Sequence, residues 1–187
     1  LMLEHAERLS DIDSRFGDAD HGLTMSKIAK AVSAAAGESE GGIQAMLDDA
    51  AMAVMVLNGG SAVPLWNTWL DGLQEEAPEG NEIDTAGIQA IFAKALKALS
   101  DMSGAKVGDK TMMDALIPAS QAIAAYSGSD EAGLFDAAAQ AALQGAEASK
   151  QFVSKFGRAK SYGEQTIGTP DAGAASMAYF FQGLARP

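Results

Sequence analysis

Apolar residues recur along most of the chain with a helical spacing, and alternating runs of β-branched residues are almost absent. Short breaks rich in Gly, Pro and Asp separate the helical segments. The pattern therefore predicts one all-α domain, residues 1–187, in which consecutive helices are antiparallel neighbours. The predicted helices cover residues 1–12, 21–36, 43–57, 61–76, 84–102, 110–126, 130–156 and 172–185.

The composition narrows the range of partners. Of the 187 residues 48% are hydrophobic, and 13 basic against 25 acidic residues give a net charge of −12. We therefore expect no nucleic acid and no anionic membrane as partner, and an anionic ligand needs a metal ion or oriented backbone N–H groups. The chain has no cysteine, which excludes disulfides and thiolate chemistry. Without a signal peptide or a membrane-length apolar run, we expect a cytoplasmic protein.

Carboxylates are concentrated where the second helix is expected to begin. Asp13 precedes Asp18 by five residues, and Asp18 and Asp20 flank a single alanine. Residues two apart in extended backbone point to the same side, and a tight turn at Gly17 would bring Asp13 to them. Carboxylates this close repel one another unless a cation holds them. Mg²⁺ suits such a group because it takes oxygen ligands and shares its shell with water and substrate phosphates.

A helix cap is the simplest alternative to a metal site in this acidic loop, because one of the aspartates could cap the helix that starts near His21. An EF-hand is excluded, since the loops that would begin at Asp11 and Asp18 have Phe16 and Leu23 in place of the required glycine. Zinc is disfavoured, because the histidines are limited to His5 and His21. We interpret Asp11 as a solvated or capping residue.

Four further loops carry glycine beside a helix start or a cationic side chain. "LNGGSAVPLWNTW" has two glycines before Ser61, and exposed N–H groups there could hold a phosphate. "SGAKVGDKTMMDAL" contains Lys110, which is either solvated or a phosphate contact, and "GRAKSYG" offers Arg158 as a phosphate fork. "GTPDAGAAS" puts Asp171 at the last helix start, as a cap or as part of a site. No P-loop motif is present.

Taken in order, five stretches resemble the nucleotide-binding L subunit of dihydroxyacetone kinase, which also occurs as the C-terminal domain of single-chain kinases. They are "DSRFGDADHG", "GGSAVPL", "GDKTMMDAL", "GRAKSYGE" and "GTPDAGAAS", and they span residues 13 to 176. The resemblance implies eight antiparallel helices in an up-and-down barrel, with a nucleotide and two Mg²⁺ ions at one end. It also implies that most of the family's first helix is missing, because only twelve residues precede Asp13.

The resemblance also implies which residues form the site. The expected metal ligands are Asp13, Asp18 and Asp20. The expected residues around ADP or ATP, from the phosphates to the base and the closing turn, are His21, Gly22, Leu23, Thr24, Ser61, Ala62, Gly104, Met112, Arg158, Asp171, Ala172 and Gly173. Three carboxylates would thus hold two divalent cations, and the cations would hold a polyphosphate.

By the same resemblance, the chain is expected to be a phosphotransferase subunit. It would pass a phosphoryl group from Mg²⁺-bound nucleotide to the hydroxyl of a short ketose, such as dihydroxyacetone or a four-carbon ketose. The family's sugar site lies on a separate K subunit, so the chain is expected to be active only with that partner. The donor is either free ATP or a phosphotransferase-system protein, and a homodimer is compatible with the family. Two alternatives stay open: a nucleotide-binding regulatory module, and the nucleotide domain of a fatty-acid kinase.

Overall fold

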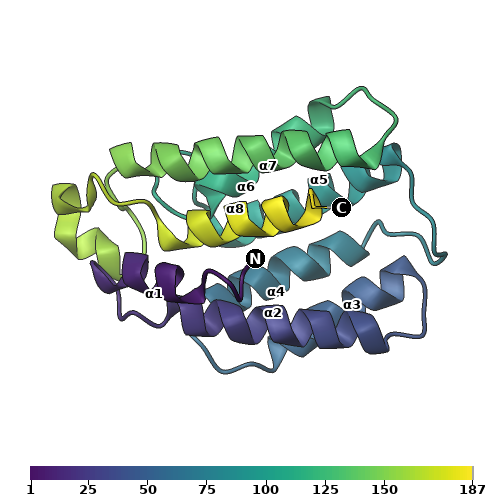
Figure 1. The fold of residues 1–187 in the computed structure, drawn as a ribbon, viewed down its shortest axis with the longest axis horizontal. Helices are drawn as coiled ribbons and strands as arrows, with labels where there is room; N and C mark the ends of the chain where they lie inside the picture. The colour runs from purple at the N-terminus through teal and green to yellow at the C-terminus, as the bar shows by residue number, and fades with distance from the viewer. Residues whose placement is uncertain (187) are drawn as a thin grey trace.

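The computed structural model describes residues 1–186, and all the regular elements in that range are helical (Figure 1). The predicted all-α fold is confirmed. Two short 3-10 helices, η1 (Ser149–Gln151) and η2 (Arg158–Thr166), lie between the last two α-helices. The α-helices are α1 (Ala6–Ser14), α2 (His21–Glu38), α3 (Ile43–Met55), α4 (Ala62–Gln74), α5 (Thr85–Ser103), α6 (Met113–Ala125), α7 (Glu131–Ala148) and α8 (Ala172–Leu184).

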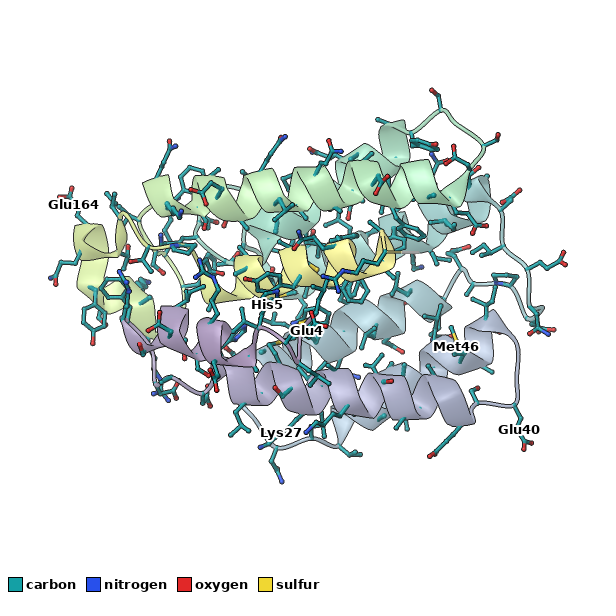
Figure 2. The ribbon with its side chains drawn as sticks, in the orientation of Figure 1. Glu4, His5, Lys27, Glu40, Met46 and Glu164 are labelled. Atoms are coloured by element: carbon teal, nitrogen blue, oxygen red, sulfur yellow. The ribbon has the colours of Figure 1, made fainter. Side chains whose placement is uncertain are left out.

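Consecutive helices pack against one another, and α8 also packs against α1 and α6. The helices alternate in direction, so α1 and α7 end, and α2, α4, α6 and α8 begin, at the end of the molecule that is on the left in Figure 1. Glu164 of η2 marks this end in Figure 2, and Glu40, between α2 and α3, marks the other. The antiparallel bundle agrees with the predicted topology, and its closure into a barrel stays a prediction.

The core contains buried residues from all eight α-helices, and its largest side chains are aromatic. Trp69 is fully buried and meets Trp66 and Phe180 edge-on, at centroid separations of 5.5 and 4.9 Å. Phe92 and Phe181 also pack against Trp69. Edge-to-face pairs of this kind add about 0.5–1.5 kcal/mol each to the area they bury. The bundle is therefore solid at its centre, and the space for a ligand lies at its end.

Small residues let neighbouring helices approach closely. A Cβ atom on Gly145 of α7 would lie 1.9 Å from the carbonyl oxygen of Asp114 in α6. Only glycine fits a contact of that length. Within residues 1–186, none of the helices has both the length and the apolar character that a membrane span requires.

Two predicted helix boundaries are wrong, and both lie at the end of the bundle that is on the left in Figure 1. The helix expected over residues 130–156 ends at Ala148, where the carbonyl of Ser149 accepts a hydrogen bond from the ammonium of Lys110 and the chain leaves through η1. The helix expected from residue 110 begins at Met113, since Lys110 has a left-handed backbone with φ of 60°.

Two smaller differences concern the first helix and the segment after α7. The first helix spans Ala6–Ser14 rather than residues 1–12. The "GRAKSYG" stretch was expected to be a loop and instead begins η2, which is kinked at Gly163 (φ 54°).

Candidate functional site

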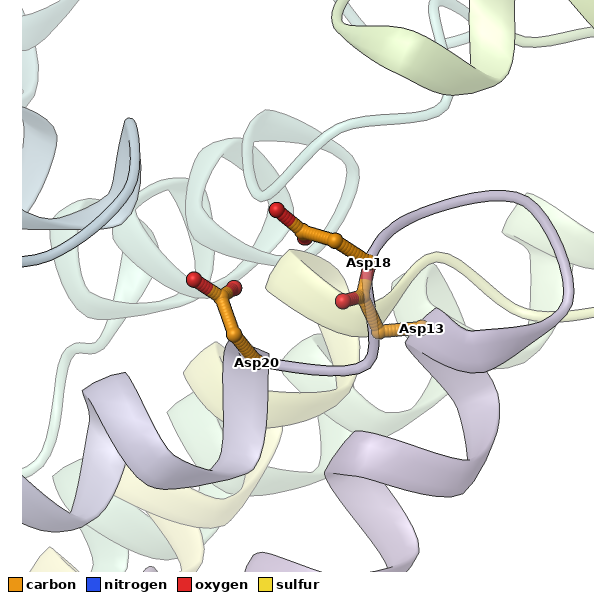
Figure 3. Close-up of side chains that lie close together, drawn as sticks. All are labelled: Asp13, Asp18 and Asp20. Carbon is orange, nitrogen blue, oxygen red and sulfur yellow. The ribbon is translucent and has the colours of Figure 1, made fainter.

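The three aspartates predicted as metal ligands lie together where α1 ends and α2 begins (Figure 3): Asp13 is in the last turn of α1, and Asp18 and Asp20 are on the turn that follows. One carboxylate oxygen of each of Asp13, Asp18 and Asp20 lies within 4.8 Å of the other two. The extended backbone expected between Asp18 and Asp20 is wrong, because Ala19 has a left-handed backbone with φ of 61°. A tight turn therefore brings the carboxylates together.

Gly17 makes room for the first of these carboxylates. A Cβ atom at this position would lie 2.1 Å from Oδ1 of Asp13, so any other residue would displace that side chain. The N–H of Gly17 also donates to the carbonyl oxygen of Asp13 at 2.7 Å, just beyond the end of α1. The predicted role of Gly17 in the turn is confirmed.

The carboxylates are not used to cap a helix. Asp20 occupies the position before α2, but its side chain makes no cap hydrogen bond. Asp84 and Asp130, at the corresponding positions of α5 and α7, do accept a backbone N–H three residues later, at 2.8 and 2.7 Å. Oδ2 of Asp13 is buried and lacks a hydrogen-bond partner among the described residues. A buried carboxylate oxygen left this way is costly unless a ligand satisfies it.

The electrostatics of the cluster favour a cation. Burial, and then the charges of Asp18 and Asp13, raise the pKa of Asp20 above its ordinary value. Arg158 opposes this shift, and its guanidinium lies 2.7 Å from Oδ2 of Asp18. That ion pair is largely exposed, so its contribution is small. An all-oxygen donor set with an unsatisfied buried oxygen and excess negative charge fits Mg²⁺.

The cluster forms part of the wall of a cavity of about 580 Å³ at this end of the bundle. That volume lies within the usual range of about 300–1,000 Å³ for small-molecule sites. The wall comes from the end of α1, the starts of α2, α4, α6 and α8, and the segment after α7. The predicted site residues that line it are Asp13, Asp18, Asp20, His21, Thr24, Ser61, Ala62, Met112, Arg158, Asp171, Ala172 and Gly173.

Three predicted site residues do not line this cavity. Gly22 faces α1, where a Cβ atom would lie 1.9 Å from the carbonyl oxygen of Ala6. Leu23 projects to the surface with 59% of its area exposed. Gly104 ends α5 in a left-handed conformation, with φ of 65°. Their contact with a nucleotide stays a prediction.

The starts of α2 and α4, both at the cavity, lack a side-chain cap. The residues before these helices are Asp20 and Ser61, and neither side chain accepts a backbone N–H of its helix. Uncapped helix starts present N–H donors and the positive end of the helix dipole, which favour anions. The two starts lie close together, because a Cβ atom at Gly60 would be 3.8 Å from both carboxylate oxygens of Asp20. The site therefore suits a cation beside an anion.

His21 is held in the cavity wall by a serine on α8. Its Nε2 lies 3.1 Å from Oγ of Ser176, whose hydroxyl donates to the carbonyl of Gly173 at 2.9 Å. Burial lowers the pKa of His21 below its ordinary value, and the charge of Asp13 and a hydrogen bond to the backbone of Ala172 only partly oppose this. The imidazole is therefore neutral at pH 7, and its position is set by α8.

The support behind the cavity wall was not predicted from the sequence. Asp114 is fully buried, and its two carboxylate oxygens accept the N–H groups of Gly108 and Thr111 at 2.6 and 2.7 Å. Lys110 was expected to be solvated or to meet a phosphate, but it is 4% exposed and its ammonium donates to backbone carbonyls. The spacing of Lys110 and Asp114 in "GDKTMMD" was the available signal. The apolar lining residues that were also missed are Ile12, Phe16, Leu65, Trp66, Phe156 and Pro170.

The family model of the DAK2 domain matches residues 15–186, a range that contains most of this cavity wall. The chain belongs to the DAK2 domain family. This membership agrees with the resemblance to dihydroxyacetone kinase that the motifs indicated.

Curated relatives of this DAK2 domain include both long kinases and short subunits. It is 37% identical over 182 residues to the D-erythrulose kinase of Mycolicibacterium smegmatis, covering 95% of this chain and 31% of that protein. It is 29% identical over 182 residues to the ADP-binding subunit DhaL of PEP-dependent dihydroxyacetone kinase 1 of Listeria innocua, covering 97% and 87%. The chain thus spans about a third of the length of the erythrulose kinases that it matches.

A solved structure has the same fold as this DAK2 domain. The dihydroxyacetone kinase of C. freundii, crystallised in complex with AMP-PNP and Mg²⁺, matches with a TM-score of 0.72 and 22% sequence identity. The match covers 98% of this chain and 31% of that one. The helical arrangement described above is therefore shared with a part of that kinase.

Proposed function

We propose that this DAK2 domain binds Mg²⁺ with ADP or ATP and delivers a phosphoryl group to a short ketose, dihydroxyacetone or erythrulose. The observation that carries the proposal is a group of three carboxylates that cap no helix, in the wall of a cavity of about 580 Å³. They lie beside two helix starts that lack a side-chain cap. The relatives support it, since they are erythrulose kinases and ADP-binding kinase subunits.

Each part of the proposed complex has a matching part of the cavity. Asp13, Asp18 and Asp20 would hold two Mg²⁺ ions, and the N–H groups at the starts of α2 and α4 would meet the phosphates. Arg158, whose guanidinium already lies beside the carboxylates, would add a cationic contact to the phosphates. The apolar lining at Met112 would receive the base.

The chain's own residues contribute positioning and charge rather than proton transfer. Mg²⁺ held by Asp13, Asp18 and Asp20 would supply neutralisation of the charge that develops on the phosphates during phosphoryl transfer. The carboxylates and helix starts fix the polyphosphate, and the surrounding wall excludes water from it. His21 is neutral but is committed to Ser176, so we assign it no role as a base for the sugar hydroxyl.

The sugar is therefore proposed to bind elsewhere, on a K-type subunit or on another segment of a longer chain. This agrees with the erythrulose kinases, in which the matched part is about a third of the protein. The donor that regenerates the nucleotide would be free ATP or a phosphotransferase-system protein, and the ADP-binding subunits of PEP-dependent kinases support the second route.

Turnover in the presence and absence of a K-type subunit tests this function. The purified chain is incubated with ATP, Mg²⁺ and dihydroxyacetone or erythrulose, and the sugar phosphate is measured. We expect none from the chain alone and turnover once the K-type subunit is added. Sustained ketose phosphorylation by the isolated chain would show that the sugar site was assigned to the wrong polypeptide. Failure of the chain to bind Mg²⁺-ADP at all would overturn the proposal.

A further inference from the structure

Lys110 is a buried cation in the cavity wall to which the proposed chemistry gives no task. It is 4% exposed, and its Nζ donates to the carbonyl oxygens of Ser149 and Thr169 at 2.6 and 2.5 Å. Ser149 lies directly after α7, and Thr169 lies two residues before the N-cap of α8. One ammonium therefore ties three segments together: the loop before α6, the end of α7 and the approach to α8.

The backbone at Lys110 is as unusual as its side chain. Its φ is 60°, and among residues 1–186 the other non-glycine residue with a positive φ is Ala19, in the carboxylate turn. A left-handed residue with a side chain persists only where its surroundings hold it, and such positions gather at functional sites. The two strained positions of the described chain thus both lie in or beside the cavity.

The segments that Lys110 joins continue directly into the cavity wall. The hydroxyl oxygen of Ser149 accepts the N–H of Asp171 at 2.9 Å, and Asp171 caps α8 through the N–H of Ala174. The next turn lies against the loop that carries Lys110, because a Cβ atom on Gly173 would be 3.3 Å from both N and Cβ of Met112. Two pieces of wall from distant parts of the sequence are therefore held in one arrangement through Lys110.

The groups around Nζ of Lys110 are carbonyl and carboxylate oxygens, which favour a cationic hydrogen-bond donor. Burial lowers the pKa of Lys110, and the carboxylates of Asp171 and Asp114 oppose that shift. Replacing the ammonium with an apolar group would leave the buried carbonyl of Thr169 without a donor among the described residues, and the carbonyl of Ser149 with only the N–H of Phe152 at 3.2 Å. The side chain points to these carbonyls, so a direct phosphate contact is not the role that the geometry supports.

We propose that Lys110 is a positioning residue for nucleotide binding, which holds the Asp171–Gly173 turn against Met112 so that together they form the wall facing the nucleoside. This inference rests on the proposed function, because it takes the cavity to be the nucleotide site. It assigns the Mg²⁺-polyphosphate end to the carboxylates and the nucleoside end to the wall that Lys110 braces. Loss of the brace should therefore affect the two ends unequally.

The test compares a whole nucleotide with its phosphate part alone. Mg²⁺-ADP and Mg²⁺-pyrophosphate are titrated into the wild-type protein, Lys110→Met, Ser149→Ala and the control Lys106→Met by calorimetry. Lys106 belongs to the same loop and its side chain is exposed. Lys106→Met therefore makes the same change of residue type while the hydrogen bonds of Lys110 stay in place. Ser149→Ala removes the acceptor of the Asp171 N–H and leaves the Lys110 ammonium in place, which covers the case of an unfolded Lys110→Met.

We expect Lys110→Met to bind Mg²⁺-ADP about tenfold more weakly than wild type and Ser149→Ala about threefold more weakly. Pyrophosphate affinity should be unchanged in both, and Lys106→Met should match wild type for both ligands. Amide hydrogen exchange at residues 169–173 of the ligand-free protein should be faster in Lys110→Met. Unchanged ADP affinity, or equal losses for ADP and pyrophosphate, would overturn the inference. No ADP binding by wild type would instead overturn the proposed function.

Discussion

Asp20 and Asp84 occupy the same position, the residue before a helix, at opposite ends of the bundle, and their side chains behave differently. Asp84 has an extended backbone, with ψ of 176°, and its carboxylate accepts the N–H of Gly87. Asp20 has a helical ψ of −7° and makes no such bond. A capping side chain needs the extended conformation to reach the N–H groups of the first turn.

The same rule separates the other helix starts. Asp130 and Asp171 have ψ of 138° and 134°, and both cap their helices. Ser61, before α4, has ψ of −17° and does not cap. Helical backbone at the residue before a helix thus leaves N–H groups and side-chain oxygens free for a ligand. At the cavity this happens at the starts of α2 and α4. At α6 the hydroxyl of Thr111 accepts the N–H of Met113, and Asp171 caps α8.

Neutralising the carboxylates should have the largest effect. Asp20→Asn and Asp18→Asn should each weaken Mg²⁺-ADP binding by about two orders of magnitude or more, because a charged oxygen ligand is lost. Asp84→Asn should bind as wild type does, since Asn caps as well as Asp. Asp13→Asn should resemble Asp20→Asn, and Asp11→Asn should be silent. Titration calorimetry with Mg²⁺ measures this, and wild-type affinity in Asp20→Asn would remove the metal assignment.

Mg²⁺ and ADP together should stabilise the folded protein much more than ADP does without the metal. Mg²⁺ with ADP at a hundredfold excess over its dissociation constant should raise the free energy of unfolding by about 2.7 kcal/mol. ADP with a chelator should stabilise much less, because the carboxylates then repel the phosphates. Thermal melting of the two samples makes the comparison. Equal melting temperatures would mean that the metal does not link carboxylates and nucleotide.

Asp171 combines the two behaviours, since it caps α8 and also lines the cavity. Burial raises its pKa to about 7. The folded state then holds a proton that the unfolded state has released, so this carboxyl makes stability fall as pH rises from about 4 to about 7. Asp171→Asn keeps the cap and lacks this titration. In ligand-free melts, the free energy of unfolding of Asp171→Asn relative to that of wild type should increase by up to about 2 kcal/mol as the pH rises from about 5 to about 8.

The direction of this effect is the informative part. If the stability difference between Asp171→Asn and wild type is the same at about pH 5 and at about pH 8, the Asp171 carboxyl is ionised in the folded protein over that whole range. The pKa of His21 is lowered, so protonation of the unfolded state weakens both proteins equally below about pH 6.5 and does not disturb the comparison.

The smallest expected effect is the change in the free energy of unfolding when Asp84 or Asp20 is replaced by alanine, and its sign distinguishes a capping aspartate from one that does not cap. Asp84→Ala should lower the free energy of unfolding by about 1 kcal/mol, because it removes a capping bond. Asp20→Ala should not destabilise the ligand-free protein, since it removes no cap and relieves repulsion from Asp18 and Asp13. Chemical denaturation in the absence of Mg²⁺ measures both. A similar loss in the two variants would show that Asp20 caps α2 in solution.

Helical periodicity was sufficient to find the α-helices because most of them bury one apolar face, although α6 is buried on all sides from Met113 to Leu116. Ile88, Phe92 and Leu99, whose spacing places them on one face of a helix, are all buried in α5. The end of α7 could not be found in this way, since the helical pattern continues past Ala148. The carbonyl of Ser149 instead accepts the ammonium of Lys110, which is 39 residues away in the sequence. No local window of sequence contains that contact.

By itself, the sequence determined which chemistry was available: three carboxylates at a fixed spacing, a glycine at the turn, and glycine-bearing loops before helix starts. Tertiary structure decided how each was used. The approach of α2 to α1 at Gly22 accompanies the left-handed turn at Ala19 and the helical ψ of Asp20, which frees its carboxylate. Asp171, in an equally plausible cap position, is extended and does cap. Backbone torsions and hydrogen-bond partners depend on what packs against a segment, so residue type and spacing alone do not define them.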